Sequence, residues 1–364
     1  MLSDSRFENR RRALASRLAA KRIDAMLLTH LTNVRYFSGF SGSNGALLVQ
    51  KDLSAQIATD GRYTTQIAQE VPDIEAKITR KVATELLSGL QGPKRVGYEA
   101  GHLSVAEFER LEKACPEDVQ LIPIQEVIED IRVRKDAVEL EKLREVATLA
   151  NQAFEEMLEA GELRAGVREI DVAASLEYRM RLKGAERTSF DTIVASGPNS
   201  AKPHHGASER IIQDGDIVTI DFGAFKAGFN SDTTRTVMVG TPSDFAREIY
   251  QVVLEAQRAG VAAAMPGTPT KDVDKACRDI IQAAGYGEYF VHSTGHGVGL
   301  DVHEAPSAAQ NSSGELEENM TLTVEPGIYV PGKGGVRIED TLVIRAGAPE
   351  NLTNLDKELR IIEA

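Results

Sequence analysis

The chain contains 364 residues, of which 42% are hydrophobic and 27% are charged, so it has the composition of a folded globular protein. At roughly 150 residues per domain, this length predicts two domains or one large domain. Acidic residues outnumber lysine and arginine by 55 to 42, and the net charge of −13 without a basic cluster excludes a typical nucleic-acid-binding protein.

The sequence also argues against a membrane or disulfide-rich protein. No stretch approaches the ~20 apolar residues of a membrane span, and the charged start MLSDSRFENRRR lacks the apolar core of a signal peptide. The two cysteines, Cys115 and Cys277, lie far apart and outside any CxxC motif, so a disulfide framework and a thiolate zinc site are not expected. We expect a cytoplasmic protein that binds neither nucleic acid nor membrane.

The first part of the chain alternates helical and strand-like segments. Helical patterns occupy residues 5–22, 63–70, 83–90 and 104–114. Short apolar strands are predicted at residues 24–29, 45–50, 55–59, 95–99 and 118–122. Between the first two strands, NVRYFSGFSGSNG is rich in glycine and serine, which predicts tight turns. This order indicates an α/β domain. Its boundary is predicted near residues 126–132, where the alternating pattern gives way to a linker and a long amphipathic helix.

The second part of the chain has a different order of predicted helices and strands. Helical stretches at residues 136–160 and 168–183 precede strands at about 190–196, 216–225 and 230–239. Two more helical stretches, at 243–264 and 270–284, precede strands at 319–330 and 336–345. A helix pair followed by strands, repeated once, indicates a duplicated α+β unit with an antiparallel sheet.

Two aspartates stand on neighbouring apolar strands in the segment IVTIDFGAFKAGFNSDTTRTVMV. Asp221 and Asp232 are an odd number of residues apart, so a two-residue turn centred on Lys226 and Ala227 would place them directly opposite each other. Opposed side chains on one face lie ~5 Å apart at Cβ. Two carboxylates at that distance repel each other unless one is protonated or a cation lies between them. The pair is therefore either a metal site or two residues that form hydrogen bonds near a turn.

Two glutamates occupy comparable positions in TLTVEPGIYVPGKGGVRIEDTLVI. Glu325 ends one apolar strand and Glu339 lies within another, with a turn rich in glycine and proline between them. Charged residues are rarely fully buried without a partner. Four carboxylates on two predicted hairpins therefore favour a cation site over a coincidence.

Three of the chain's seven histidines, His292, His296 and His303, fall within VHSTGHGVGLDVHE. A helical HExxH zinc motif would need glutamate where Ser293 stands, and the glycines indicate a loop or a strained strand. GHGVG does not complete a dinucleotide-binding fingerprint. A lone histidine is more often a core residue than a ligand, but this density favours a site.

A polar loop, ASGPNSAKPHHGAS, precedes the strand that carries the first aspartate. It contains His204 and His205. Either at least one of them faces the same cavity as the carboxylates, or both are exposed loop residues. The residues alone leave these two alternatives equally open.

Taken together, IDFGA, the aspartate pair, GHGVGLDVHE, TVEPG and RIED resemble the pita-bread metallopeptidases, which include methionine aminopeptidase, aminopeptidase P and prolidase. SGFSGSNGALLV and ATDGRY are similar to the non-catalytic N-terminal domain of aminopeptidase P, prolidase and creatinase. The resemblance covers nearly the whole chain. It implies an α+β pita-bread catalytic domain at residues 129–364, preceded by a smaller α/β domain at residues 1–128.

The resemblance also implies a set of metal ligands. Five positions match them: Asp221, Asp232, His296, Glu325 and Glu339. Asp232 and Glu339 match the residues that bridge two divalent metal ions. Four carboxylates and one imidazole suit Mn²⁺ and tolerate Co²⁺ or Zn²⁺. By the same resemblance, Glu325 would accept a proton when an activated water attacks the scissile carbonyl.

Other residues match the family's substrate pocket. His204 matches a catalytic histidine through its spacing from the first aspartate ligand, and it is preferred to His205. His303 would stabilise the oxyanion of the tetrahedral intermediate. His292 would line the pocket, and Arg337 matches an arginine that holds substrate or a carboxylate.

The implied activity is that of a dinuclear metal-dependent exopeptidase, a homodimer that cleaves the bond between an N-terminal residue and proline in peptides. Proline's tertiary amide lacks the N–H on which ordinary aminopeptidases depend. The N-terminal motifs favour an aminopeptidase P-like enzyme, and a prolidase restricted to Xaa-Pro dipeptides is the alternative. All five ligand positions are filled, which disfavours a metal-free amidinohydrolase like creatinase. A non-catalytic peptide- or partner-binding protein of this fold is the remote alternative.

Overall fold

The computed structural model describes residues 5–92 and 94–363, so only the first four residues of the charged start MLSDSRFENRRR lie outside it. The chain divides into two compact units, Met1–Arg132 and Val133–Ala364. The short helix α6 (Glu129–Arg132) belongs to the first unit, because Arg132 donates a 2.8 Å hydrogen bond to Asn33. Among the described helices, none combines the length and the apolar character needed to cross a bilayer.

The first unit is built on one six-stranded sheet in the order β4-β3-β2-β1-β5-β6. All strands run in the same direction except β2, which is antiparallel to both of its neighbours. The strands are β1 (Ala25–Leu28), β2 (Gly45–Gln50), β3 (Ala55–Thr59), β4 (Glu75–Ile78), β5 (Lys94–Glu99) and β6 (Val119–Ile124). The helices are α1 (Ser5–Ala20), α2 (Leu31–Ser38), α3 (Thr64–Glu70), α4 (Val82–Ser88) and α5 (Val105–Ala114). Helices α4 and α5 pack on one face of this sheet.

Three elements of the first unit, α2, β4 and the short α6, were not predicted from the sequence. Residues 31–38 form helix α2 instead of tight turns, because Val34 and Phe37 recur at helical spacing and are fully buried. The helix ends at Gly39, whose φ of 86° lies in the left-handed region that glycine adopts without strain. Strand β4 was not predicted, because its residues EAKI are mostly exposed and form no apolar run.

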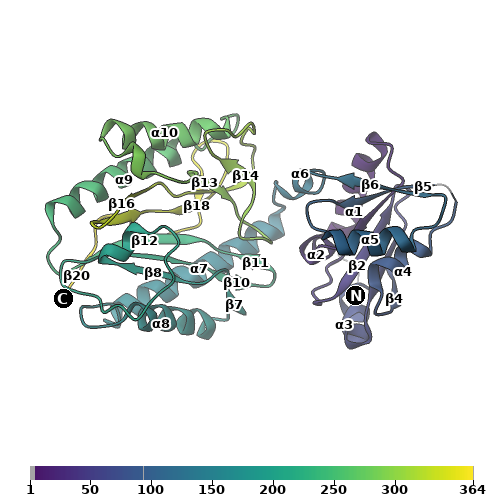
Figure 1. Cartoon of the computed structure of the whole chain (residues 1–364), viewed down its shortest axis with the longest axis horizontal. Helices are drawn as coiled ribbons and strands as arrows, with labels where there is room; N and C mark the ends of the chain where they lie inside the picture. Colours follow the sequence, from purple (N-terminus) through teal and green to yellow (C-terminus); the bar gives the residue numbers. More distant parts are fainter. Residues whose placement is uncertain (1–4, 93, 364) are drawn as a thin grey trace. The chain divides into compact units, whose positions relative to one another are not determined.

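The second unit contains two helix pairs, each followed by strands, in agreement with the predicted order. Figure 1 shows α9 and α10 on one side of these strands and α7 and α8 on the other. The first half comprises α7 (Ala137–Glu159), α8 (Glu169–Leu182), β7 (Arg187–Thr188), β8 (Ile193–Ser196), β9 (Ile217–Phe222), β10 (Ala224–Lys226), β11 (Phe229–Asn230) and β12 (Thr233–Val239). The second comprises α9 (Asp244–Ala263), α10 (Thr270–Ala283), β13 (Gly295–Gly297), β14 (Glu304–Ala308), β15 (Thr321–Val324), β16 (Gly327–Val330), β17 (Gly334–Arg337), β18 (Asp340–Val343), β19 (Glu350–Asn351) and β20 (Ile361–Ile362).

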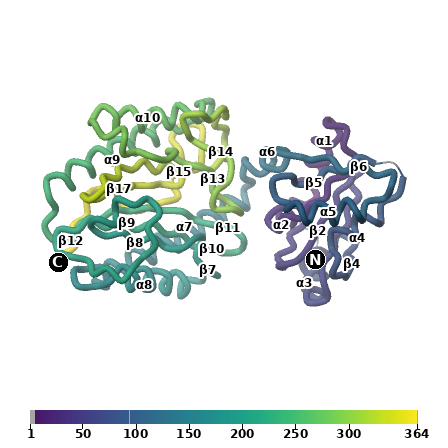
Figure 2. The backbone as a smooth tube through the Cα atoms, viewed as in Figure 1, coloured from purple at the N-terminus to yellow at the C-terminus, as the bar shows by residue number. Residues whose placement is uncertain are grey.

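The strands of the second half lie between helices α9 and α10 and the sheet of the first half. In Figure 2 the yellow strands β15 and β17 run between green α9 and teal β9 and β12. The first-half sheet has the order β20-β12-β9-β8, and β15, β18 and β19 form a second sheet. This arrangement brings residues that are far apart in sequence to one interior face.

The hairpin that carries the two aspartates has a different register from the predicted one. Its turn lies at Ala227 and Gly228, one residue later than predicted, and both have positive φ values of 51° and 92°. Such a turn strongly prefers glycine at its second position. Asp221 therefore pairs with Thr234, and the predicted direct opposition of Asp221 and Asp232 is wrong. The two aspartates lie diagonally on one face, which still keeps their side chains close.

The strands predicted at residues 319–330 and 336–345 each break in the middle. Strand β15 pairs with β18, whereas β16 pairs with β17, so the chain changes partners at Glu325 and again at Glu339. Glu339 therefore lies between two strands, and its predicted position inside a strand is wrong. Its backbone amide donates a 3.1 Å hydrogen bond to the Thr234 carbonyl, which ties this crossing to β12.

The aromatic contact between α7 and β9 provides a test of the second unit's core. Phe154 stacks on Phe222 with ring centroids 5.1 Å apart, and both side chains are buried. We expect Phe154→Ala to lower the free energy of unfolding by about 3–5 kcal/mol, because it leaves a cavity. Denaturant unfolding followed by circular dichroism measures this change. As a control, Tyr178→Ala removes a ring that is 64% exposed on α8, and it should change stability by less than about 0.5 kcal/mol. Equal losses of unfolding free energy in the two variants would contradict the assignment of Phe154 to the core and of Tyr178 to the surface.

Candidate metal centre

A cavity of about 560 Å³ in the second unit brings the predicted site residues together. All of them except Glu339 line it, and Glu339 lies buried next to the two aspartates. The lining residues are Phe190, Asp191, Ile193, Pro203, His204, His205, Gly206, Asp221, Asp232, His292, Ser293, His296, His303, Glu325 and Arg337.

Three carboxylates form the inner wall of the cluster. Asp221, Asp232 and Glu339 each place one oxygen within 4.8 Å of the others. Among the described residues, no donor reaches Asp221 Oδ1 or Glu339 Oε1, although both oxygens are buried. Burial and then the neighbouring carboxylates raise the pKa of Asp232 and Glu339 well above the usual range. Because a buried acceptor without a partner is costly, this cluster fits a bound cation.

His296 on β13 faces the carboxylates from the other side. Its Nε2 lies 3.3 Å from Glu325 Oε1 and 3.6 Å from Asp232 Oδ2. Its Nδ1 lies 3.0 Å from the Gly297 carbonyl, which can only accept, so Nδ1 carries a proton. Nε2 is therefore oriented as a donor when protonated and as a metal ligand when deprotonated, the arrangement that metal-binding histidines commonly have.

Glu325 differs from the other carboxylates in its pKa. Burial raises this pKa, but the hydrogen bond and the charge of His296 outweigh burial and lower it to about 2. The Thr323 hydroxyl donates to Glu325 Oε1 over 3.2 Å, and the Glu325 amide donates to the Thr294 carbonyl over 2.8 Å. Glu325 is thus held as an ionised carboxylate at the wall of the cavity.

Glycines next to His296 let the surrounding strands approach closely. A Cβ atom at Gly295 would lie 1.8 Å from the Thr323 carbonyl oxygen, and one at Gly297 would lie 2.1 Å from the Ala305 carbonyl oxygen. Real Cβ atoms do not approach backbone this closely. The glycine-rich segment is therefore the short strand β13, packed against β15.

Arg337 is buried, and its guanidinium already has partners within the protein. It donates 2.7 Å hydrogen bonds to Asp221 Oδ2 and to the Tyr329 hydroxyl. Longer bonds of 3.1 and 3.3 Å reach the Thr234 hydroxyl and the Pro203 carbonyl. Arg337 thus orients Asp221 and neutralises part of the carboxylate cluster.

Tyr329 is a site residue that the sequence prediction missed. Its hydroxyl accepts from Arg337 and lies 2.8 Å from His292 Nε2, while His292 Nδ1 lies 2.8 Å from the Ser293 carbonyl. That carbonyl can only accept, so His292 Nε2 accepts the tyrosine proton. Burial raises the pKa of Tyr329 to about 12, so it remains a donor. In the sequence Tyr329 is an ordinary aromatic residue of an apolar strand, which gives no functional signal.

The remaining histidines lie at the more exposed side of the cavity. The His303 ring is 4.3 Å from the His296 ring, and one of its nitrogens lies within 4.8 Å of ligand atoms of Asp232 and His296. His204 is exposed and lines the cavity. His205, also in the lining, is turned toward a buried carboxylate of helix α8.

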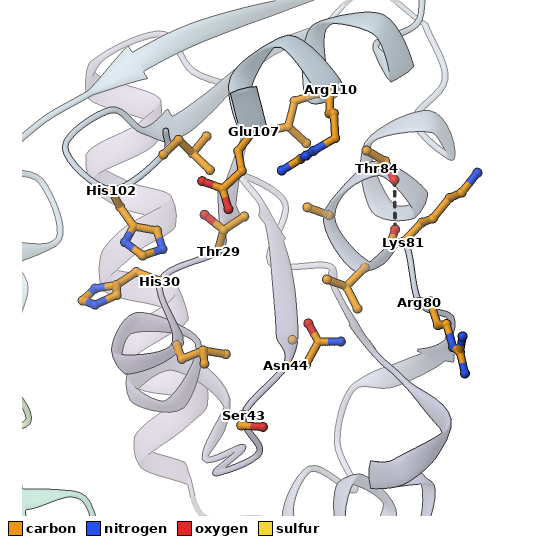
Figure 3. Close-up of a pocket in the computed structure, with 16 residues that line it drawn as sticks. Thr29, His30, Ser43, Asn44, Arg80, Lys81, Thr84, His102, Glu107 and Arg110 are labelled. Atoms are coloured by element: carbon orange, nitrogen blue, oxygen red, sulfur yellow. Dashed lines mark hydrogen bonds between the residues drawn. The ribbon is translucent and has the colours of Figure 1, made fainter. Parts of the chain in front are cut away.

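A larger cavity, of about 650 Å³, lies within the first unit (Figure 3). Its lining includes His30, which precedes α2, His102, which precedes α5, and Glu107 and Arg110 on α5 itself. Among the described residues, both groups of three or more potential metal ligands lie in the second unit. The larger cavity therefore does not offer the chemistry of the metal centre.

Known proteins share both parts of this structure. The profile of Metallopeptidase family M24 matches residues 141–346, and that of the Creatinase/Prolidase N-terminal domain matches residues 10–134. The Xaa-Pro dipeptidase of Pyrococcus furiosus is 41% identical over 341 residues, 93% of this chain and 95% of that protein.

Solved structures agree with these matches. The Xaa-Pro dipeptidase from Bacillus anthracis has a TM-score of 0.92 at 42% identity, covering 98% of this chain and 99% of the other. The X-Pro aminopeptidase from Thermotoga maritima has a TM-score of 0.88 at 37% identity, covering 97% and 99%. The pita-bread fold and the two-part organisation expected from the sequence are thereby confirmed.

The close packing of β13 gives a test of the metal centre. We expect Gly295→Ala to weaken Mn²⁺ binding at least about tenfold and to lower the free energy of unfolding by about 1–3 kcal/mol, because the added methyl group forces β13 away from β15. Calorimetric titration with Mn²⁺ and denaturant unfolding measure the two effects. Gly314→Ala is the control, since its Cβ would meet the Thr270 side chain at an ordinary 3.7 Å. Unchanged Mn²⁺ affinity in Gly295→Ala would contradict the proposed packing constraint.

Proposed function

This chain belongs to metallopeptidase family M24 and is a peptidase, and we propose that it hydrolyses Xaa-Pro dipeptides with two divalent metal ions. The observation that carries this proposal is the pair of buried carboxylate oxygens, Asp221 Oδ1 and Glu339 Oε1, that lack a donor among the described residues. Asp221 lines a cavity large enough for a small peptide, together with His296 and Glu325, and Glu339 lies buried next to Asp221.

The charges of the cluster support two ions. Four carboxylates face one another. Arg337 pairs with Asp221, and the His296 imidazole lies beside Glu325 and Asp232. Two divalent cations would offset the remaining negative charge. The oxygen-rich donor set favours Mn²⁺ and also accommodates Co²⁺ or Zn²⁺.

The positions of the ligands support the expected division between the two ions. Asp232 belongs to both groups of close ligand atoms, one with Asp221 and Glu339 and the other with His296 and His303. This supports a bridging role for Asp232, and Glu339, next to it, is proposed as the second bridge. Asp221 would be the further ligand of one ion, and His296 and Glu325 would be the further ligands of the other.

The protein's own residues would then carry the reaction as follows. When bound, the two ions would supply Lewis acidity and a water of lowered pKa. Glu325 at the cavity wall would accept the proton of that water. His303 would donate a hydrogen bond to the scissile carbonyl oxygen as negative charge develops on it. His204 would contact the substrate from the loop at the mouth.

Roles for His292 and Arg337 follow from their hydrogen bonds. Both lie in the network that runs from Arg337 through Tyr329 to His292. The guanidinium has four partners in the protein, so we propose that Arg337 holds Asp221 rather than the carboxylate of a dipeptide. His292 would present its ring to the substrate while its two nitrogens are occupied.

Substrate length is the finer part of this proposal. The segments FSGFSGSNG and TDGRY favour an aminopeptidase P-like enzyme that trims longer peptides. The similar proteins named as Xaa-Pro dipeptidases, at 41% and 42% identity, support a dipeptidase, whereas the named aminopeptidase is 37% identical. We therefore place the dipeptidase first and the aminopeptidase second.

The family resemblance also supports a homodimeric cytoplasmic enzyme. In this proposal the first unit, expected at residues 1–128 and ending at Arg132 in the structure, is the non-catalytic domain. The second unit, expected at residues 129–364, is the catalytic domain. Light scattering of the full chain would give the mass of the assembly.

Removal of metal provides the first test of the activity. Dialysis against a chelator should abolish hydrolysis of Ala-Pro, and added Mn²⁺ should restore it. Asp232→Asn should lower the bound metal from about two ions per chain to fewer than one, because a bridge is lost. His303→Ala is the comparison: it should keep the metal and lose about 10²–10³-fold in kcat. Unchanged turnover after complete chelation would refute a metal-dependent mechanism, and equal metal loss in both variants would refute the separate role of His303.

A paired assay tests the substrate length. The Mn²⁺-loaded enzyme should cleave Ala-Pro with a kcat/KM at least about tenfold above that for Ala-Pro-Ala, since a dipeptidase recognises the free carboxylate next to the scissile bond. Chromatographic detection of released alanine follows both reactions on one scale. Faster cleavage of the tripeptide would reverse the order of the two candidates.

A further inference from the structure

Glu169, the first residue of α8, is a fully buried carboxylate that the reaction described above does not use. It lies outside the metal cluster and has no arginine or lysine partner among the described ion pairs. Its oxygens accept hydrogen bonds instead from one segment of chain, the loop at residues 196–208, which carries His204 and His205.

The bonds to Glu169 hold both ends of this loop. At its start, the amide and the hydroxyl of Ser196 donate to Oε1 over 2.8 and 2.7 Å. At its end, the amide and the hydroxyl of Ser208 donate to Oε2 over 3.1 and 2.5 Å. The Asn199 amide adds a further bond of 3.0 Å to Oε1. One carboxylate therefore closes the loop at both ends and at an intermediate point.

A histidine of the loop is also bound to this carboxylate. His205 Nε2 lies 2.8 Å from Glu169 Oε2. Burial raises the pKa of Glu169, but the hydrogen bonds from Ser208, Ser196, Asn199 and His205 together outweigh burial and lower it to about 2. The carboxylate is therefore ionised, and His205 Nε2 is the donor.

The loop has a second attachment on the other side of His204. The Pro203 carbonyl accepts a 3.3 Å hydrogen bond from Arg337, the same residue that holds Asp221. The two neighbours of His204 are thus fixed, Pro203 by Arg337 and His205 by Glu169. The His204 side chain itself is exposed at the cavity, and no described residue forms a hydrogen bond with it.

We propose that Glu169 and His205 are positioning residues, which hold the loop so that His204 stands over the metal centre. This inference rests on the proposed function for its effect on catalysis, and on the loop geometry alone for its effect on structure. It assigns different work to the adjacent histidines: His204 contacts substrate, whereas His205 anchors the backbone. A misplacement of about 1 Å in a substrate-contacting group can cost about a hundredfold in rate.

The chain offers variants that separate the donor at position 205 from the histidine ring. In His205→Gln the side-chain amide can donate to Glu169 in place of Nε2, so we expect kcat to fall less than about threefold. His205→Phe keeps a ring but has no donor, and we expect kcat to fall at least about tenfold with bound metal unchanged. His204→Gln should lose as much as His205→Phe, because in this inference His204 acts through its imidazole.

Glu169 is tested by the same logic. Glu169→Gln replaces an acceptor oxygen by an NH₂ group that faces the loop donors, so we expect at least about a tenfold loss in kcat with KM and metal content nearly unchanged. Glu169→Asp keeps the charge and should retain more activity than Glu169→Gln. The control is Glu177→Gln, the same change at a half-buried position of the same helix, which should behave as the parent enzyme.

A readout without substrate keeps the inference separate from the proposed function. In the full-length Mn²⁺-loaded protein, hydrogen exchange of residues 197–208 should rise at least about tenfold in Glu169→Gln and in His205→Phe, but not in Glu177→Gln. If the parent chain does not cleave Xaa-Pro peptides, the proposed function fails while this exchange result still stands or falls independently. Unchanged exchange in both loop variants, or a loss in His205→Gln as large as in His205→Phe, would overturn the positioning role.

Discussion

The structure of the second unit depends on one electrostatic constraint: four carboxylates lie close together in its interior, and among the described residues one guanidinium, that of Arg337, pairs with them. Charges removed from water repel one another strongly unless opposite charge or protons compensate them. Arg337 pairs with Asp221, yet Asp221 Oδ1 and Glu339 Oε1 have no hydrogen-bond donor among the described residues. The surrounding fold holds these groups together, and the raised pKa values of Asp232 and Glu339 reflect the cost of doing so.

The residues around the carboxylates contribute to holding this cluster in different ways. The glycines of β13 allow an imidazole to reach the carboxylates from a closely packed strand. Tyr329 and Arg337 distribute hydrogen bonds to groups that would otherwise be buried without partners. Further out, Glu169 is ionised because several donors of one loop converge on it.

The sequence predicted which residues lie in the cluster, but it did not predict the strand register that brings them together. Asp221, Asp232 and Glu325 could be singled out as carboxylates in or next to apolar strands. His296 could be singled out as one of three histidines in a glycine-rich segment, and Arg337 only through the family resemblance. All five line one cavity. The hairpin register could not be predicted from the odd spacing alone, because the turn follows glycine at its second position and not the symmetry of the carboxylates. Glu169 gave no signal, since an acidic residue in the first turn of a helix is common and its partners lie up to 39 residues away.

The break at Glu339 couples metal capture to topology. This residue stands where the chain leaves its pairing with β16 and begins its pairing with β15, and its amide is tied to β12. A chain that has formed its separate hairpins but not this crossing would lack one carboxylate of the cluster. Ions that bind only the completed arrangement favour it by mass action. Bound metal would then stabilise only those chains in which both halves of the duplicated unit have packed together, and incompletely assembled chains would not gain this stabilisation.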